Sequence, residues 1–248
     1  MIEQSLEISL PSGKAEAFLY KPDAVGAFPG VLFLTDIWGI REQNQRMARR
    51  LAERGFAVLM PNAFFRYSRL PIVPADFEFQ MGEERSMKII GALFASLTAP
   101  QMAADGAIYV DFLLKQQGVA GRQAGVVGYC FTGAMALRIA AAVPDKIAAA
   151  ASFHGGRLVT DDADSPHLLL PKVKARLYFG HAVEDQSMTA ENIAALEAAL
   201  RAWHGAFQSE TYEGALHGWT VPGRPIYNEL QAERAFGKLV ELMKASLE

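Results

Sequence analysis

The stretch GVVGYCFTGAM, residues 125–135, decides the fold of this chain. It joins an apolar segment, predicted as a buried strand over 124–129, to an alanine-rich segment predicted as a helix over 131–142. Cys130, the one cysteine in 248 residues, lies on the turn between them, two residues after Gly128. A strand-to-helix turn with small neighbours is the setting of a nucleophile elbow, which presents one reactive side chain at the edge of a sheet.

Two features on the helix side of this elbow bear on its chemistry. Thr132 is β-branched where glycine is usual, so the match is to a relaxed form of the motif. The amino-terminal dipole of the predicted helix favours a thiolate over a thiol at Cys130, and its free amides can bind an oxyanion. The alternative without a catalytic role is that Cys130 is a small buried core residue.

Strands and helices alternate through most of the sequence. This alternation predicts an α/β fold, one domain over 1–248 with a mostly parallel sheet and helices on both faces. Residues 62–100 are predicted as an irregular excursion over a pocket, and 155–171 as a polar surface loop. The remaining predicted strands are a pair within 5–20, then 30–34, 56–60, 147–153, 175–180 and 206–212, and the remaining helices are 41–54, 101–117, 189–203 and 228–247.

Composition excludes several classes of protein. The chain is 51% hydrophobic and carries 24 Lys and Arg against 27 Asp and Glu, a net charge of −3 without a basic stripe. We therefore expect a small-molecule partner, with no nucleic acid and no membrane. The amino terminus lacks a leader pattern, and a lone cysteine fits a reducing compartment, so we expect a cytoplasmic protein. Whether it is a monomer or a homodimer is left open.

Two further residues complete a nucleophilic triad in the chain order nucleophile, acid, base. Asp185 follows the predicted strand 175–180, and His217 lies in the loop after the last predicted strand. Because loops at the carboxyl ends of parallel strands converge on one edge of a sheet, Cys130, Asp185 and His217 are expected to meet there. Asp185 could instead cap the next helix, with Glu184 as a competitor for the acid.

No pattern in the sequence indicates a metal or a cofactor. There is no His-x-x-x-His, no cysteine cluster and no glycine-rich phosphate loop opening a helix. We therefore expect no metal and no cofactor.

The chain resembles the dienelactone hydrolase family of α/β-hydrolases over nearly its whole length. The resemblance is carried by Gly128-Tyr129-Cys130, by Asp185, by the segment 214–219 (GALHGW) and by the segment 35–39 (TDIWG). It implies an α/β-hydrolase fold and a cofactor-independent hydrolase of a small ester or lactone, with Cys130, Asp185 and His217 as the catalytic residues. It also implies that the amides of Ile37 and Phe131 form the oxyanion hole. Asp36 stands where the family commonly has a glutamate that interacts with the resting thiol.

Departures from the family pattern concern the substrate. Family members bind a substrate carboxylate through arginines, but no arginine follows His217 until Arg224, beyond a proline turn, and Arg85 is an uncertain counterpart of the other. A dienelactone substrate therefore does not follow. Pocket-lining roles are predicted for Trp38 and Trp219, which adjoin proposed catalytic positions, for His154, which faces the catalytic edge, and for Arg85 in the predicted excursion. Two alternatives stay open: a ligand-binding or sensor protein with little turnover, and a thioesterase or acyl transferase.

Overall fold

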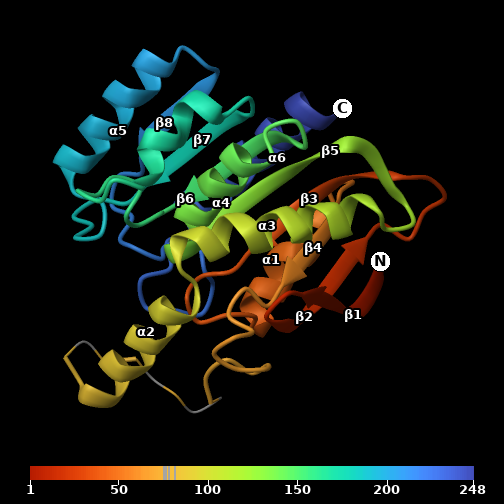
Figure 1. Ribbon diagram of the computed structural model, residues 1–248, viewed down its shortest axis with the longest axis horizontal. Helices are drawn as coiled ribbons and strands as arrows, with labels where there is room; N and C mark the ends of the chain where they lie inside the picture. Colours follow the sequence, from red (N-terminus) through yellow and green to blue (C-terminus); the bar gives the residue numbers. More distant parts are fainter. Residues whose placement is uncertain (75–76, 78, 81) are drawn as a thin grey trace.

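One eight-stranded sheet runs through the protein, seen in a computed structural model that describes residues 1–74, 77, 79, 80 and 82–248 (Figure 1). The strand order is β1-β2-β4-β3-β5-β6-β7-β8. The strands from β4 to β8 in this order pair in parallel, whereas β1 and β2 form an antiparallel edge. The predicted mostly parallel sheet is confirmed. The bounds are β1 Ile2–Leu10, β2 Gly13–Lys21, β3 Phe28–Leu34, β4 Ala57–Pro61, β5 Val119–Tyr129, β6 Ile147–Phe153, β7 Arg176–His181 and β8 Phe207–Thr211.

Helices cover both faces of this sheet, as the sequence predicts. The side chains of α1 and α6 pack in one apolar core, and those of α3, α4 and α5 pack in a second core on the opposite face (Figure 1). The helices are α1 Glu42–Ala52, α2 Glu84–Ser96, α3 Ala99–Leu114, α4 Phe131–Ala142, α5 Ala190–Trp203 and α6 Glu229–Leu247, with a 3₁₀ helix, η1, at Pro166–Lys172.

Burial on both faces explains the continuous apolar run of the central strand β5. Val126 belongs to the core under α3 and α4, and the next residue, Val127, belongs to the core under α1 and α6. Both are fully buried. Successive residues of a strand point to opposite faces of the sheet. When helices cover both faces, every position of the strand is buried, so its residues are continuously apolar instead of alternating between apolar and polar. The carboxyl ends of the parallel strands meet at one edge, where the loops after β5, β7 and β8 converge.

The prediction of an irregular segment over 62–100 is wrong for its second half. Residues 84–96 form α2, which begins where the Glu83 carboxylate accepts a hydrogen bond from the Ser86 amide at 3.2 Å. Only Ser86 and Leu93 are buried in α2, which leaves a weak apolar periodicity and explains why the pattern is missed. In Figure 1 this helix projects from the body of the sheet. Positions 75, 76, 78 and 81 of the predicted excursion lie outside the described residues.

The segment 155–171 is also more ordered and more buried than predicted. Leu158 and Ser165 are fully buried, and the Ser165 hydroxyl accepts a hydrogen bond from the Thr160 amide at 2.8 Å. The segment ends in η1, which packs against α4 and α5. The acidic residues Asp161, Asp162 and Asp164 are exposed, whereas Gly155 and Gly156 at the start of the segment are buried. Within the described chain no helix is long and apolar enough to cross a bilayer.

Candidate active site

Cys130 occupies a strained turn between β5 and α4. Its backbone has φ 58° and ψ −125°, outside the region that residues with side chains normally adopt. The turn brings the start of α4 back against the end of β5, so that a Cβ atom placed on Gly128 would lie 2.1 Å from the carbonyl oxygen of Thr132. A glycine at position 128 is therefore a requirement of the turn, as the elbow pattern predicts.

Thr132 connects this turn to the end of the neighbouring strand β3 through hydrogen bonds of its hydroxyl group. Its Oγ1 accepts a hydrogen bond from the Tyr129 amide at 3.0 Å and lies 2.8 Å from the carbonyl oxygen of Thr35, to which it donates. Thr132 is fully buried. The residue that departs from the usual glycine thus links the elbow to the loop after β3, the loop that carries Ile37.

The structure brings Cys130, His217 and Asp185 together in one chain of hydrogen bonds. The Sγ atom of Cys130 lies 3.1 Å from Nε2 of His217, and Nδ1 of His217 lies 2.6 Å from Oδ2 of Asp185. Asp185 follows β7 and His217 follows β8, so both reach the elbow from the carboxyl ends of strands. The opposite ring nitrogens contact the sulfur and the carboxylate, which is the geometry of a nucleophile, a base and an orienting acid.

Ser187 is a fourth member of this network that the sequence interpretation missed. Its hydroxyl donates to Oδ1 of Asp185 at 2.6 Å, and its amide donates to the same oxygen at 2.8 Å. The hydroxyl also lies 3.4 Å from Nδ1 of His217. An Asp followed two residues later by Ser is a common turn pattern, and it is the signal that could have identified this residue. With one oxygen held by Ser187, Asp185 presents the other to His217.

The charges of the triad support one another. Burial would lower the pKa of His217, but the negative charge of the Cys130 sulfur and the hydrogen bond to Asp185 outweigh it and raise that pKa to about 10. Burial would likewise raise the pKa of Asp185, yet the hydrogen bonds from His217 and Ser187 hold it below its usual value. Both shifts favour an imidazolium at His217 beside a carboxylate at Asp185.

His154 and Trp219 pack behind the triad instead of lining a pocket, so their predicted pocket role is wrong. The ring of His154 meets that of His217 edge to face at 5.2 Å and that of Trp219 at 5.1 Å. Both are almost fully buried, and Nε2 of His154 lies 2.8 Å from the Thr220 hydroxyl. The positive φ of His154, 40°, turns its side chain inward beneath His217. Burial and the neighbouring His217 charge lower the pKa of His154 well below its ordinary value, so this histidine is neutral.

Asp36 is buried, and its hydrogen bonds go to its own turn and to the start of α1. Oδ1 accepts from the Trp38 amide at 3.0 Å, and Oδ2 pairs with the guanidinium of Arg41. Cys130 Sγ is bonded to His217. The thiol-activating role expected from the family resemblance therefore has no contact in this structure to support it, whereas a role in shaping the loop that carries Ile37 does.

An apolar cavity of about 340 Å³ opens in front of the Cys130 sulfur. It is lined by Ile37, Trp38, Phe79, Met87, Ile90, Phe94, Cys130, Phe131, Gly156, Arg157, Ser187, His217 and Arg224. Met87 and Phe94, both from α2, remain 44% and 41% exposed, so the cavity wall contains uncovered apolar surface. We call this space the active-site cavity. Its size lies within the range of ligand sites for small molecules, about 300–1,000 Å³.

The residues predicted for this cavity are partly those found. Ile37, Phe131 and Trp38 line it, whereas Arg85 does not. Arg85 is exposed in the first turn of α2, with its guanidinium 5.8 Å from the Phe77 ring centroid. Its guanidinium is taken up by this contact with Phe77 and is not part of the cavity lining, so its predicted pocket role is wrong.

Two arginines that the sequence interpretation did not place in a pocket line the cavity. Arg224 comes back to it because the turn at Pro222 and Gly223 reverses the chain after His217. Arg157 follows β6 and has a φ of 56°, and it pairs with Asp162 at 3.5 Å. The cavity thus combines apolar walls with two cationic groups. Among the residues that the structure describes, no cluster of three or more His, Cys, Asp or Glu side chains is arranged to hold a metal ion.

Comparisons with known proteins agree with this site and this fold. The model of the family described as "Dienelactone hydrolase family" matches residues 15–247. A relative from Synechocystis sp., named "Putative carboxymethylenebutenolidase", is 24% identical over 233 residues, which cover 93% of this chain and 91% of the relative.

Solved structures show the same fold. A crystal structure from Klebsiella pneumoniae, described as "Putative Dienelactone Hydrolase", has a TM-score of 0.83 at 20% identity and covers 98% of this chain and 99% of its own. The acylaminoacyl peptidase of Pyrococcus horikoshii has a TM-score of 0.70 at 14% identity and covers 99% of this chain and 42% of its own. The arrangement of strands and helices is therefore the α/β-hydrolase fold.

Proposed function

We propose that this chain, which belongs to the dienelactone hydrolase family, hydrolyses small carboxylic esters or lactones through a covalent thioester on Cys130. The observation that carries the proposal is the hydrogen-bond chain from Cys130 Sγ to His217 Nε2 at 3.1 Å and from His217 Nδ1 to Asp185 Oδ2 at 2.6 Å. A sulfur nucleophile needs a base that can hold its proton. His217 lies within hydrogen-bond distance of the sulfur, and its raised pKa allows it to hold that proton.

The first half of the reaction forms the thioester. The Cys130 thiolate attacks the carbonyl carbon of the substrate, and the carbonyl π electrons move onto the oxygen to give a tetrahedral oxyanion. As the oxyanion collapses, the bond from carbon to the alcohol oxygen breaks, and His217 donates its Nε2 proton to that oxygen. The alcohol leaves from the side of His217, and in a lactone it stays attached to the acyl chain.

The amides of Ile37 and Phe131 are our candidates for stabilising the oxyanion. Both residues line the cavity beside the sulfur, and Phe131 is the first residue of α4, where an amide has no acceptor within the helix. Loss of one such donor typically costs about 10²–10³ in turnover. The link from Thr132 to Thr35 supports this role, because it holds the two loops at a fixed separation.

The second half returns the enzyme to its starting state. Neutral His217 accepts a proton from a water molecule, which attacks the thioester carbon. Collapse then breaks the carbon–sulfur bond, releases the carboxylic acid and restores the Cys130 thiolate beside a protonated His217. Asp185, held by Ser187, keeps the ring in the tautomer that presents Nε2 to the reacting atoms.

Hydrolysis of an ester panel by wild type, Cys130→Ala and Cys130→Ser tests the proposal. The panel contains p-nitrophenyl esters and lactones, each with and without a free carboxylate, because Arg224 has no carboxylate partner among the described ion pairs. Samples are quenched during turnover, and the mass of the intact protein is measured by mass spectrometry. Cys130 is the one thiol of the chain, so an acyl adduct that is lost with Cys130→Ala identifies the nucleophile.

The same experiment separates the other candidate functions. Wild-type turnover that survives in Cys130→Ala would contradict the triad mechanism. An inert, unacylated Cys130 would favour the ligand-binding or sensor protein. An adduct that reacts faster with an added amine or alcohol than with water would favour an acyl transferase.

A further inference from the structure

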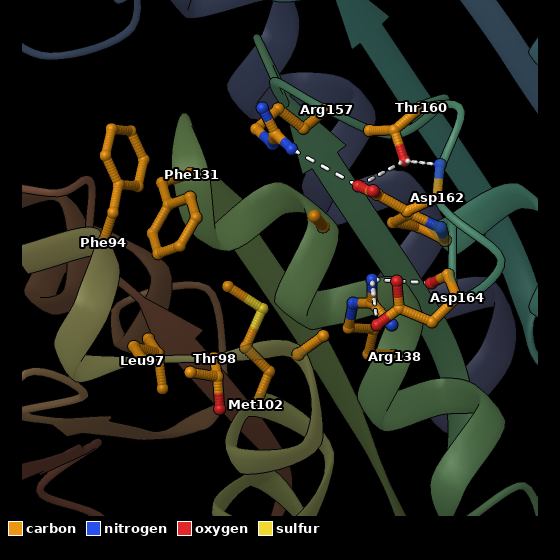
Figure 2. Close-up of a pocket in the computed structure, with 13 residues that line it drawn as sticks. Phe94, Leu97, Thr98, Met102, Phe131, Arg138, Arg157, Thr160, Asp162 and Asp164 are labelled. Atoms are coloured by element: carbon orange, nitrogen blue, oxygen red, sulfur yellow. Dashed lines mark hydrogen bonds and ion pairs between the residues drawn. The ribbon is translucent and has the colours of Figure 1, made fainter. Parts of the chain in front are cut away.

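Figure 2 shows a second cavity, of about 390 Å³, which shares lining residues with the active-site cavity. We call it the side cavity. Its lining residues are Phe94, Leu97, Thr98, Ala99, Met102, Phe131, Ala134, Arg138, Arg157, Thr160, Asp162, Asp164 and Pro166. They come from α2, the start of α3, the first turns of α4 and the segment that precedes η1.

The two cavities share a wall. Phe94, Phe131 and Arg157 line both, and the rings of Phe94 and Phe131 meet edge to face with centroids 4.7 Å apart. Phe131 directly follows the nucleophile Cys130, so the side cavity begins one residue from the reacting sulfur. Phe94 is 41% exposed on α2, so this shared wall is open to solvent on one side and is not sealed by the core. A ligand in front of Cys130 can therefore extend past these rings.

The floor of the side cavity is apolar, and its rim is balanced in charge. Figure 2 shows Phe94, Phe131, Leu97 and Met102 on one side and the charged residues on the other. Arg138 donates to the Asp164 carbonyl oxygen at 2.7 Å and faces its carboxylate at 3.7 Å, and Arg157 pairs with Asp162 at 3.5 Å. Two guanidinium groups thus meet two carboxylates. An uncharged, apolar group fits this surface better than an ion does.

The triad indicates which part of a substrate reaches this cavity. His217 donates its proton to the departing oxygen, so the leaving alcohol must lie on the His217 side of the sulfur. His217, Ser187 and Arg224 line the active-site cavity, whereas the side cavity is bounded by Phe131 and α2 instead. The group that extends away from His217 is the one that stays bonded to Cys130, the acyl chain.

We infer that the side cavity is an acyl-chain subsite, which makes this chain selective for esters of extended, uncharged apolar acids. The inference rests on the proposed function, since it assigns the substrate class of the same site. Each methylene transferred from water to this cavity is expected to raise kcat/KM about fourfold. Selectivity therefore increases with acyl length until the cavity is full.

A series of p-nitrophenyl esters with a constant leaving group tests the inference. We would measure kcat/KM for the acetate, butanoate, hexanoate and octanoate with wild type, Ala134→Leu and Ala99→Leu. Ala134 and Ala99 line the side cavity from two different helices and do not line the active-site cavity, so leucine there fills the subsite alone. Ala202→Leu, at an exposed position of α5, is the matched control for the same chemical change.

We expect the octanoate-to-acetate ratio of kcat/KM to fall at least about tenfold in both filling variants and to stay unchanged in Ala202→Leu. Should Ala134→Leu fail to fold, Ala99→Leu, at a half-buried position, gives the same comparison. A ratio that does not respond to filling, or a wild-type kcat/KM that does not rise from the acetate to the octanoate, would overturn the subsite. Failure to hydrolyse even the acetate would instead overturn the proposed function.

Discussion

Replacing Thr132 by valine removes one buried hydroxyl with almost no change in shape. The Tyr129 amide loses its acceptor at 3.0 Å, and the Thr35 carbonyl loses a donor at 2.8 Å. A buried polar group left without a partner costs about 1–3 kcal/mol, and a carbonyl with a second lone pair tolerates the loss better than an amide. We therefore expect the free energy of unfolding to fall by about 2–3 kcal/mol.

The effect on catalysis should exceed what that loss of stability alone explains. Thr132 joins the elbow to Thr35, two residues before Ile37, so the valine variant releases the loop that carries a proposed oxyanion donor. Displacing one such donor costs about 10²-fold in kcat. Thr132→Ser keeps the hydroxyl and should retain kcat within a few-fold, which separates the hydrogen bond from the methyl group.

Urea unfolding and steady-state hydrolysis of p-nitrophenyl acetate, measured on the same preparations, check both numbers. The decisive comparison is kcat at a temperature where wild type and both variants are fully folded. Wild-type kcat in Thr132→Val would refute the reasoning that this hydroxyl fixes the oxyanion loop. An equal loss in Thr132→Ser and Thr132→Val would show that packing of the methyl group matters and the hydrogen bond does not.

Two further predictions concern the histidines. In His217→Asn, alkylation of Cys130 by iodoacetamide at pH 6.5 should slow at least about tenfold, because the variant lacks the imidazolium 3.1 Å from the sulfur. Mass spectrometry measures the alkylation rate, and an unchanged rate would contradict this prediction. Burial lowers the pKa of His181 from 6.5 to about 4, so the unfolded chain takes up the proton first as the pH falls. Stability should therefore be intact above pH 6.5 and decrease by up to about 3 kcal/mol towards pH 4, and urea unfolding of His181→Gln should show a weaker decrease than wild type.

The elbow turn and the proximity of Cys130, Asp185 and His217 could be predicted because their signals are local and ordered. Gly128 and Cys130 stand at a change from strand to helix, and Asp185 and His217 follow strands whose carboxyl ends share one edge. A parallel sheet converts chain order into spatial proximity, so the sequence suffices to predict that these residues meet.

Other parts of the site depend on how side chains pack, which a strand-and-helix pattern does not contain. His154 follows a strand just as Asp185 does, but its left-handed backbone turns the ring inward beneath His217. Arg224 is seven residues beyond His217, and only the turn at Pro222 and Gly223 returns it to the cavity. Helix α2 buries only Ser86 and Leu93, so its weak periodicity is hard to distinguish from a loop.

The left-handed backbone of Cys130 sets stability against activity at a single residue. A φ of 58° with a side chain costs about 1–3 kcal/mol, which glycine would not incur. Selection for a more heat-resistant chain alone would thus favour loss of the proposed nucleophile, whereas selection for turnover would preserve the strain. A more thermostable form of this enzyme must therefore gain its stability from substitutions at other positions and keep the strained backbone at Cys130.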